Sequence, residues 1–130
     1  MASEIARLVE LGQSPWYDNL DRHLLRNSEL AALVHDHAIR GVTSNPTILA
    51  KAISGGDAYE EQLAGCAHDG LGPDDAYWAI VIADIVAAAD LLRPVYDVTA
   101  GADGFVSLEV SPLIAHDTDA TIAAARPRSG

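Results

Sequence analysis

Three short segments with the pattern of β-strands alternate with longer helical segments along this chain of 130 residues. The strand-like segments are residues 13–20, 41–44 and 105–110, and the last alternates polar and apolar side chains most clearly. Short strands separated by helices favour a parallel sheet with right-handed crossovers. The sequence therefore predicts the α/β fold class, with about three parallel strands and intervening helices.

The helical segments are marked by capping residues and by apolar positions at spacings of three and four. The longest, residues 74–92, is expected to bury Trp78, Ile82, Ile85, Ala89 and Leu92, and Pro94 should end or kink it. Asn45 and Pro46 should begin a helix over 47–53. The remaining helices are predicted at 3–11, from 22 to the interruption at Asn27, at 28–37, 57–68 and from 118 to Pro127, with Asp21, Ser28, Asp57 and Asp117 as caps.

The length of the chain limits how this pattern can close. A complete barrel of eight alternating strands and helices takes about 250 residues, so residues 1–130 can form only the front part of one domain of this kind. We therefore expect a partial TIM barrel with helices on one side of the sheet. Such a sheet has an unpaired edge and uncovered apolar surface, so we expect the isolated chain to be partly molten, to self-associate or to need a complementing chain.

The composition excludes several classes of partner. Asp and Glu total 19 against 8 Lys and Arg, and the net charge of -11 argues against binding nucleic acid or an anionic membrane. The longest apolar run, Ala76 to Ala83, is far short of the roughly 20 residues of a membrane span. The single cysteine, Cys66, the absence of a signal-peptide pattern and the lack of metal-ligand spacing predict a cytoplasmic protein without disulfide, metal or cofactor.

Polar side chains mark the predicted C-terminal ends of the strands, where barrels of this type hold their active sites. On the third strand Ser107 and Glu109 share one face with Ser111, and the apolar residues on the other face should meet helices. Thr43 and Asn45 share one face of the second strand, and Asp18 lies near the end of the first. An alternative is that Asp18 and Asn45 cap helices and that Glu109 is a solvated strand end.

Three motifs in this sequence resemble those of the transaldolases. Residues 41–49 (GVTSNPTIL) resemble the family's first signature, residues 13–20 (QSPWYDNL) the opening strand of its long bacterial form, and residues 103–112 (DGFVSLEVSP) its third-strand motif. The order is that of the family, from about Glu10 to Ala125. The resemblance implies a class I aldolase type of barrel. Such an enzyme moves a dihydroxyacetone unit through a Schiff base, from a ketose phosphate such as sedoheptulose 7-phosphate to an aldose phosphate such as glyceraldehyde 3-phosphate, in the pentose phosphate pathway.

The resemblance also implies roles for individual residues. Asp18 matches the aspartate that assists proton transfer during carbon–carbon bond cleavage, and Glu109 matches the glutamate that works with a water as acid and base on the imine. Asn45 matches the asparagine that hydrogen-bonds the bound dihydroxyacetone part, and Thr43 lines the same rim. Two carboxylates in different surroundings can divide such proton transfers between them.

The nucleophile of such an enzyme is a lysine, which in the family lies on the fourth strand. The only lysine here is Lys51, which is expected on a short helix and matches no catalytic position, so we expect it to be solvated. Residues 126–130 do not resemble the family's continuation. We therefore expect a chain that stops before the fourth strand and is inactive alone. The alternatives are half of a split enzyme, a non-catalytic domain that binds a partner or a sugar phosphate, and a gene fragment without function.

Overall fold

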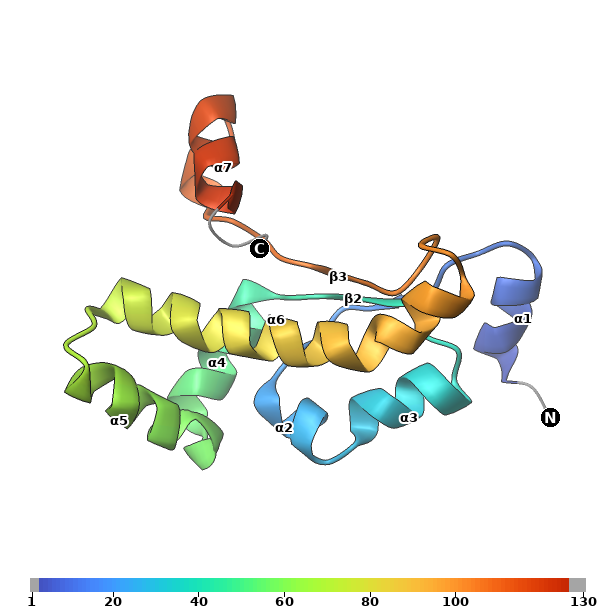
Figure 1. The fold of residues 1–130 in the computed structure, drawn as a ribbon, viewed down its shortest axis with the longest axis horizontal. Helices are drawn as coiled ribbons and strands as arrows, with labels where there is room; N and C mark the ends of the chain where they lie inside the picture. The colour runs from blue at the N-terminus through green and yellow to red at the C-terminus, as the bar shows by residue number, and fades with distance from the viewer. Residues whose placement is uncertain (1–2, 127–130) are drawn as a thin grey trace.

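The computed structural model describes residues 3–126 and contains a small sheet with helices before, between and after its strands (Figure 1). Its elements are, in chain order, α1 (Glu4–Glu10), β1 (Trp16–Tyr17), α2 (Arg22–Arg26), α3 (Glu29–Asp36), β2 (Gly41–Thr43), α4 (Pro46–Gly55), the 3-10 helix η1 (Asp57–Tyr59), α5 (Glu60–His68), α6 (Pro73–Val98), β3 (Phe105–Ser107), the 3-10 helix η2 (Pro112–Ile114) and α7 (Thr118–Ala125). The expectation that Pro127 ends the last helix lies outside the described residues.

The three strands form one parallel sheet in the order β1-β2-β3, which confirms the predicted fold class. Gly41 pairs with Trp16 on one side and Phe105 on the other, and Thr43 pairs with Ser107. The third strand ends at Ser107 and not near Val110 as predicted. Its partner β2 ends at the paired residue, Thr43, because Asn45 and Pro46 begin a helix. The Ser44 N–H donates the last hydrogen bond between the two segments, to the Ser107 carbonyl (3.1 Å).

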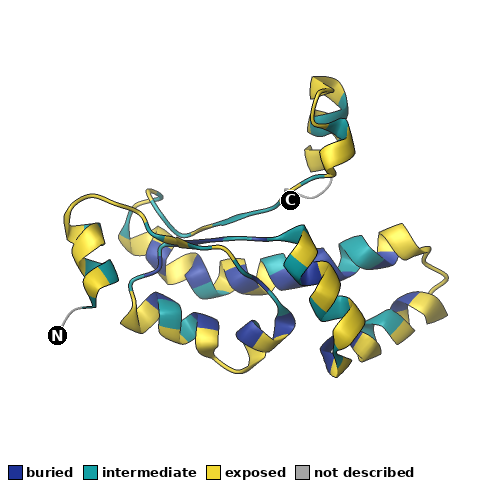
Figure 2. Cartoon of the chain, turned by 180° about the vertical axis from the view of Figure 1, so that it is seen from behind, coloured by how far each residue is buried: buried dark blue, intermediate teal, exposed yellow. Residues whose placement is uncertain are grey.

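One face of the sheet is covered by helices and the other is bare among the described residues (Figures 1 and 2). Val42 is fully buried against α2, α3 and α6, and Tyr17 and Val106 pack on the same cluster. A second cluster joins α4, η1 and α6, and Leu108 packs on it. α7 stands away from this body and buries none of its residues. This one-sided arrangement is the predicted partial barrel.

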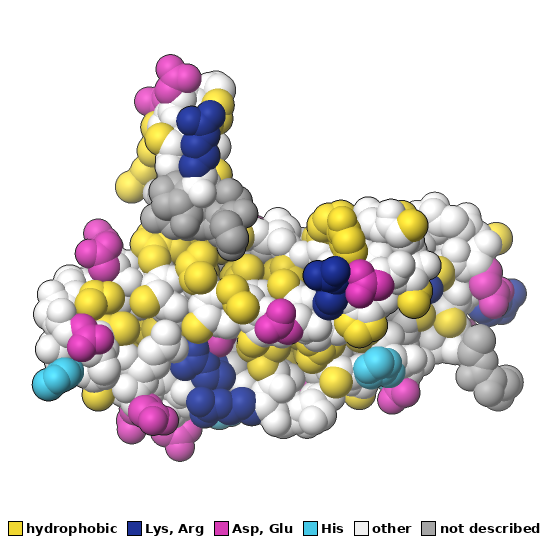
Figure 3. All heavy atoms as spheres, in the orientation of Figure 1, with side chains coloured by type: hydrophobic (Ala, Val, Ile, Leu, Met, Phe, Trp, Pro, Cys, Tyr) yellow, Lys and Arg dark blue, Asp and Glu magenta, His cyan; other side chains and the backbone are white. Residues whose placement is uncertain are grey.

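The buried face of α6 differs from the predicted stripe. Ala89 is exposed, and Trp78, Ile82 and Ile85 are only half-buried, while the buried positions are Ala76, Ile80, Val81, Asp84, Ala88, Leu92 and Val95. The helix is apolar on almost every side, so periodicity does not single out one face. The ion pair of Asp84 with Arg22 inside the protein determines which face of α6 is buried. Apolar side chains consequently gather on the outward face of the molecule along α6 (Figure 3).

Pro94, which was predicted to end or kink its helix, does not end α6, which continues to Val98. Pro94 and Asp90, whose carbonyl loses its N–H partner, are both exposed to water. Two predictions about helix caps were wrong. Ser28 has φ 66° and accepts no capping hydrogen bond, since a cap needs extended backbone; the Asn27 side chain accepts from Glu29 N–H instead (3.0 Å). Asp57 lies inside η1 and caps nothing, whereas Asp21 and Asp117 cap α2 and α7 as predicted.

Trp16 lies flat across Gly41 on the bare face of the sheet. A methyl group built at Gly41 would overlap the Trp16 ring, so only glycine leaves room for the indole. The indole N–H donates to Ser14 Oγ (3.1 Å), and Ser14 Oγ donates to Asp103 Oδ1 (2.6 Å). These contacts fix Trp16 and tie β1 to the turn before β3.

Gly41→Ala is therefore expected to displace Trp16 and to lower the free energy of unfolding by about 1–3 kcal/mol, as overpacking does. The measurement is tryptophan fluorescence together with urea unfolding. Gly65→Ala is the matched control, because a methyl group there meets nothing within 4 Å and favours helix α5. Unchanged Trp16 emission in Gly41→Ala would contradict the packing described here.

Among residues 3–126, no helix has the length and apolar character that crossing a membrane requires.

Candidate active site at the open edge of the sheet

The bare face of the sheet carries the polar residues that the sequence singled out. Side chains alternate along a strand, and Val42 and Val106 point into the helices. Thr43 and Ser107 therefore point to the opposite face, at paired positions of β2 and β3. Because the strands are parallel, their C-terminal ends meet at one edge, and Asp18, Asn45 and Glu109 each follow a strand at that edge.

Asp18 and Thr43 are joined directly across two strands. Thr43 Oγ1 donates a hydrogen bond to Asp18 Oδ1 (2.5 Å), and the Asp18 side chain is exposed. The alternative of Asp18 as a helix cap is wrong, since Asp21 caps α2 by accepting from Leu24 N–H (2.8 Å). The carboxylate is thus held by a hydroxyl at the sheet edge while it stays open to a ligand.

Asn45 does cap a helix, as the alternative interpretation proposed. Its side-chain oxygen accepts from the N–H groups of Thr47 (3.1 Å) and Ile48 (3.3 Å) at the start of α4. The side-chain NH₂ donates to no group within residues 3–126. Capping and ligand binding are therefore compatible here, because capping uses the oxygen and leaves both amide hydrogens available.

Glu109 lies two residues beyond β3. Thr43 and Ser107 are the last paired residues of β2 and β3, and the residue before Glu109, Leu108, packs on the helices. Glu109 is exposed and has no hydrogen-bond partner in the part of the chain that the structure describes. The structure thus joins Asp18 to Thr43 and brings Asn45 and Glu109 to the same edge without a bond between them.

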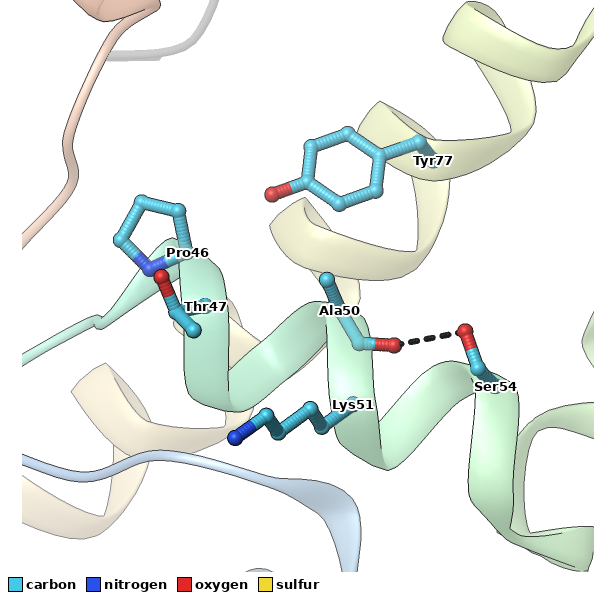
Figure 4. Close-up of a pocket in the computed structure, with 6 residues that line it drawn as sticks. All are labelled: Pro46, Thr47, Ala50, Lys51, Ser54 and Tyr77. Atoms are coloured by element: carbon cyan, nitrogen blue, oxygen red, sulfur yellow. Dashed lines mark hydrogen bonds between the residues drawn. The ribbon is translucent and has the colours of Figure 1, made fainter.

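Lys51 lies elsewhere, on α4, beside a shallow depression between α4 and α6. The depression is lined by Pro46, Thr47, Ala50, Lys51, Ser54 and Tyr77 (Figure 4). The Lys51 side chain is exposed and runs along the side of α4 away from Tyr77. Burial raises the pKa of the Tyr77 hydroxyl above its usual value. This depression belongs to the helical layer and not to the open face of the sheet.

A buried ring of hydrogen-bonded polar side chains close to the end of β1 was not predicted from the sequence. Arg22 Nε donates to Asp84 Oδ1 (2.9 Å), the Tyr59 hydroxyl donates to Asp84 Oδ2 (2.8 Å), and the backbone N–H of Arg22 donates to the Tyr59 hydroxyl oxygen (2.8 Å). All three residues are buried, and the Arg22 guanidinium also lies over the Tyr59 ring. The one signal in the sequence is Asp84, a carboxylate that interrupts the apolar run of α6.

The electrostatics of this ring favour one protonation state. Desolvation and the hydrogen bond to Asp84 raise the pKa of Tyr59 far above its usual value, so the phenol stays protonated. The hydroxyl can therefore donate to Asp84 and accept from Arg22 at the same time. Gln62 completes the shell by accepting from Arg22 Nη2 (2.6 Å).

Three parallel strands with helices between them, and polar residues after the C-terminal ends of the strands, are typical of part of a parallel α/β barrel. Residues 15–127 match the family model described as transaldolase/fructose-6-phosphate aldolase. The chain belongs to this family.

Curated relatives agree with this assignment. Transaldolase 1 of Streptomyces avermitilis is 50% identical over 94% of this chain, the transaldolase of Parafrankia sp. 47% over 97%, and transaldolase 2 of Nostoc punctiforme 44% over 95%. The alignments cover 32%, 34% and 32% of these relatives, so the chain spans about a third of their length, namely the N-terminal third.

Proposed function

We propose that this chain forms the first three strands of a transaldolase barrel and contributes Asp18, Asn45 and Glu109 to its active site. The reaction is the transfer of a dihydroxyacetone unit from sedoheptulose 7-phosphate to glyceraldehyde 3-phosphate through a Schiff base, a step of the pentose phosphate pathway. The observation that supports it best is the Asp18–Thr43 hydrogen bond on the helix-free face, at the edge shared with Asn45 and Glu109.

The proposed roles follow from the protons and hydrogen bonds that each group can accept or donate. Asp18 accepts the proton of the donor hydroxyl as the carbon–carbon bond breaks, and Thr43 holds the carboxylate in place. The free NH₂ of Asn45 donates to an oxygen of the dihydroxyacetone part. Glu109, which is exposed, moves protons to and from a water during loss and return of water at the carbinolamine.

The imine nitrogen must come from a lysine outside these 130 residues. Lys51 is the only lysine of the chain, and it projects from α4 and not from the open face of the sheet. We propose that further barrel strands, in the same polypeptide or in a complementing chain, provide this lysine and the groups that bind phosphate. The bare sheet face, with Trp16 40% and Phe105 44% exposed, favours this over an autonomous binding domain.

Within this proposal the protein works in the cytoplasm on sugar phosphates. The free, buried Cys66 suits a reducing compartment.

Imine trapping tests the assignment of the lysine. The protein to compare with the 130-residue chain is a joined protein, in which residues 1–125 precede the remaining two-thirds of the Streptomyces avermitilis relative. With fructose 6-phosphate and borohydride, intact mass spectrometry should find no adduct on the chain alone and one adduct, on a lysine of the added part, in the joined protein. Lys51→Arg in the joined protein should trap equally well, and an adduct on Lys51 would overturn the assignment.

A further inference from the structure

We propose that the buried ring of Arg22, Tyr59 and Asp84 positions Asp18 for the reaction proposed above. The inference rests on that proposed function for the role of Asp18. It assigns to Tyr59 and Asp84 the part of positioning residues, which act on the site through the short segment 18–22 and do not touch the substrate.

The segment 18–22 is held at each of its parts. Its first residue, Asp18, accepts from Thr43, and its centre, Leu20, is fully buried in the first core cluster. Its last residue, Arg22, is bonded through its backbone N–H to Tyr59 and through its side chain to Asp84. A connection so short transmits a displacement at Arg22 to Asp18, because four residues leave few backbone torsions to absorb it.

The same ring reaches the second strand end. Tyr59 is fully buried in the cluster that contains Leu49, and Leu49 lies on α4, the helix that Asn45 caps. Leu49 N–H also donates to the Asn45 carbonyl (2.9 Å). Tyr59 thus contacts both the segment that carries Asp18 and the helix that Asn45 caps. One buried phenol therefore sets the spacing between Asp18 and Asn45.

Tyr59→Phe separates the positioning role of the hydroxyl from the packing role of the ring. The substitution keeps the ring that fills the core and the Arg22–Asp84 ion pair. It removes only the hydroxyl, which accepts from the Arg22 backbone N–H and donates to Asp84. Tyr96→Phe is the matched control, because Tyr96 is 40% exposed and its hydroxyl bonds no group among residues 3–126.

The first measurement uses the 130-residue chain and needs no activity. Amide hydrogen exchange and NMR should show that Tyr59→Phe speeds exchange in residues 19–22 by about 5- to 30-fold, the size expected for one lost buried hydrogen bond. The Thr43 side-chain resonances should shift with it, while Tyr96→Phe leaves both unchanged. An effect confined to the Arg22 amide, or one spread evenly over the chain, would overturn the proposal.

The second measurement uses the joined protein. Tyr59→Phe should lower kcat about 10- to 100-fold, as a small misplacement of a reacting group does, and leave KM unchanged. An unchanged kcat with normal imine trapping would overturn the positioning role and leave the proposed function intact. A joined protein that is inactive before any substitution would instead refute the proposed function, and the exchange result would still decide the geometry.

A milder variant covers the case in which Tyr59→Phe does not fold. Gln62→Leu removes the outer partner of Arg22 and leaves Tyr59 and Asp84 in place. It should give a smaller change in the same direction in exchange of residues 19–22. Unchanged exchange there and an unchanged kcat would count against the proposal.

Discussion

Asp84→Ala is expected to lower the free energy of unfolding by about 3–5 kcal/mol, a large share of the whole stability of a small domain. The substitution leaves the Arg22 guanidinium inside the protein with no carboxylate to pair with, since the Arg22 and Asp84 side chains are only 10% and 3% exposed. It also leaves the Tyr59 hydroxyl without its acceptor. Urea unfolding followed by circular dichroism is the measurement.

Two further variants show whether the loss of stability comes from the unpaired charge. Arg22→Met combined with Asp84→Leu removes both buried charges, so much of the lost stability should return. Asp97→Ala breaks the exposed pair that Arg93 and Asp97 form on α6 (2.9 Å), and it should change nothing measurable because water and salt screen that pair. A double variant as unstable as Asp84→Ala would show that the loss comes from packing and not from the unpaired charge.

Asp18→Asn in the joined protein is expected to reduce kcat by about 10²- to 10⁴-fold, the range of a general acid or base. The amide has the shape of the carboxylate and can still accept from Thr43, but it cannot take up the proton released when the carbon–carbon bond breaks. Steady-state kinetics of the transfer reaction measure the effect, and KM should change little.

Asp90→Asn serves as the control for that experiment. Asp90 is an exposed carboxylate on α6, in the helical layer, so the same change of charge there should leave kcat unaltered. A full-rate Asp18→Asn enzyme, or an equal loss in both variants, would contradict the role given to Asp18.

The polar residues at the C-terminal ends of the strands could be predicted from the sequence because two simple rules place them. Side chains alternate along a strand, and parallel strands end at one edge, so Thr43, Ser107 and Glu109 follow from their spacing alone. Neither rule says which polar group bonds which. The pairing of Asp18 with Thr43 and the cap formed by Asn45 needed the structure.

The buried face of α6 and the polar ring could not be predicted, for one physical reason. The helix is apolar on nearly all sides between Ala76 and Leu92, so its orientation is chosen by the partner of Asp84 and not by periodicity. That partner, Arg22, lies 62 positions away in the sequence. Ser28 shows the same limit locally, since a left-handed φ of 66° overrode its preference for capping.

The most direct measurement of the central claim is the transfer reaction itself. The joined protein, the 130-residue chain and the added two-thirds alone are each incubated with sedoheptulose 7-phosphate and glyceraldehyde 3-phosphate, and the products are followed by mass spectrometry. We expect fructose 6-phosphate and erythrose 4-phosphate from the joined protein and from neither part alone. A joined protein that folds cooperatively and still forms no product would contradict it, as would product formation by the 130-residue chain alone.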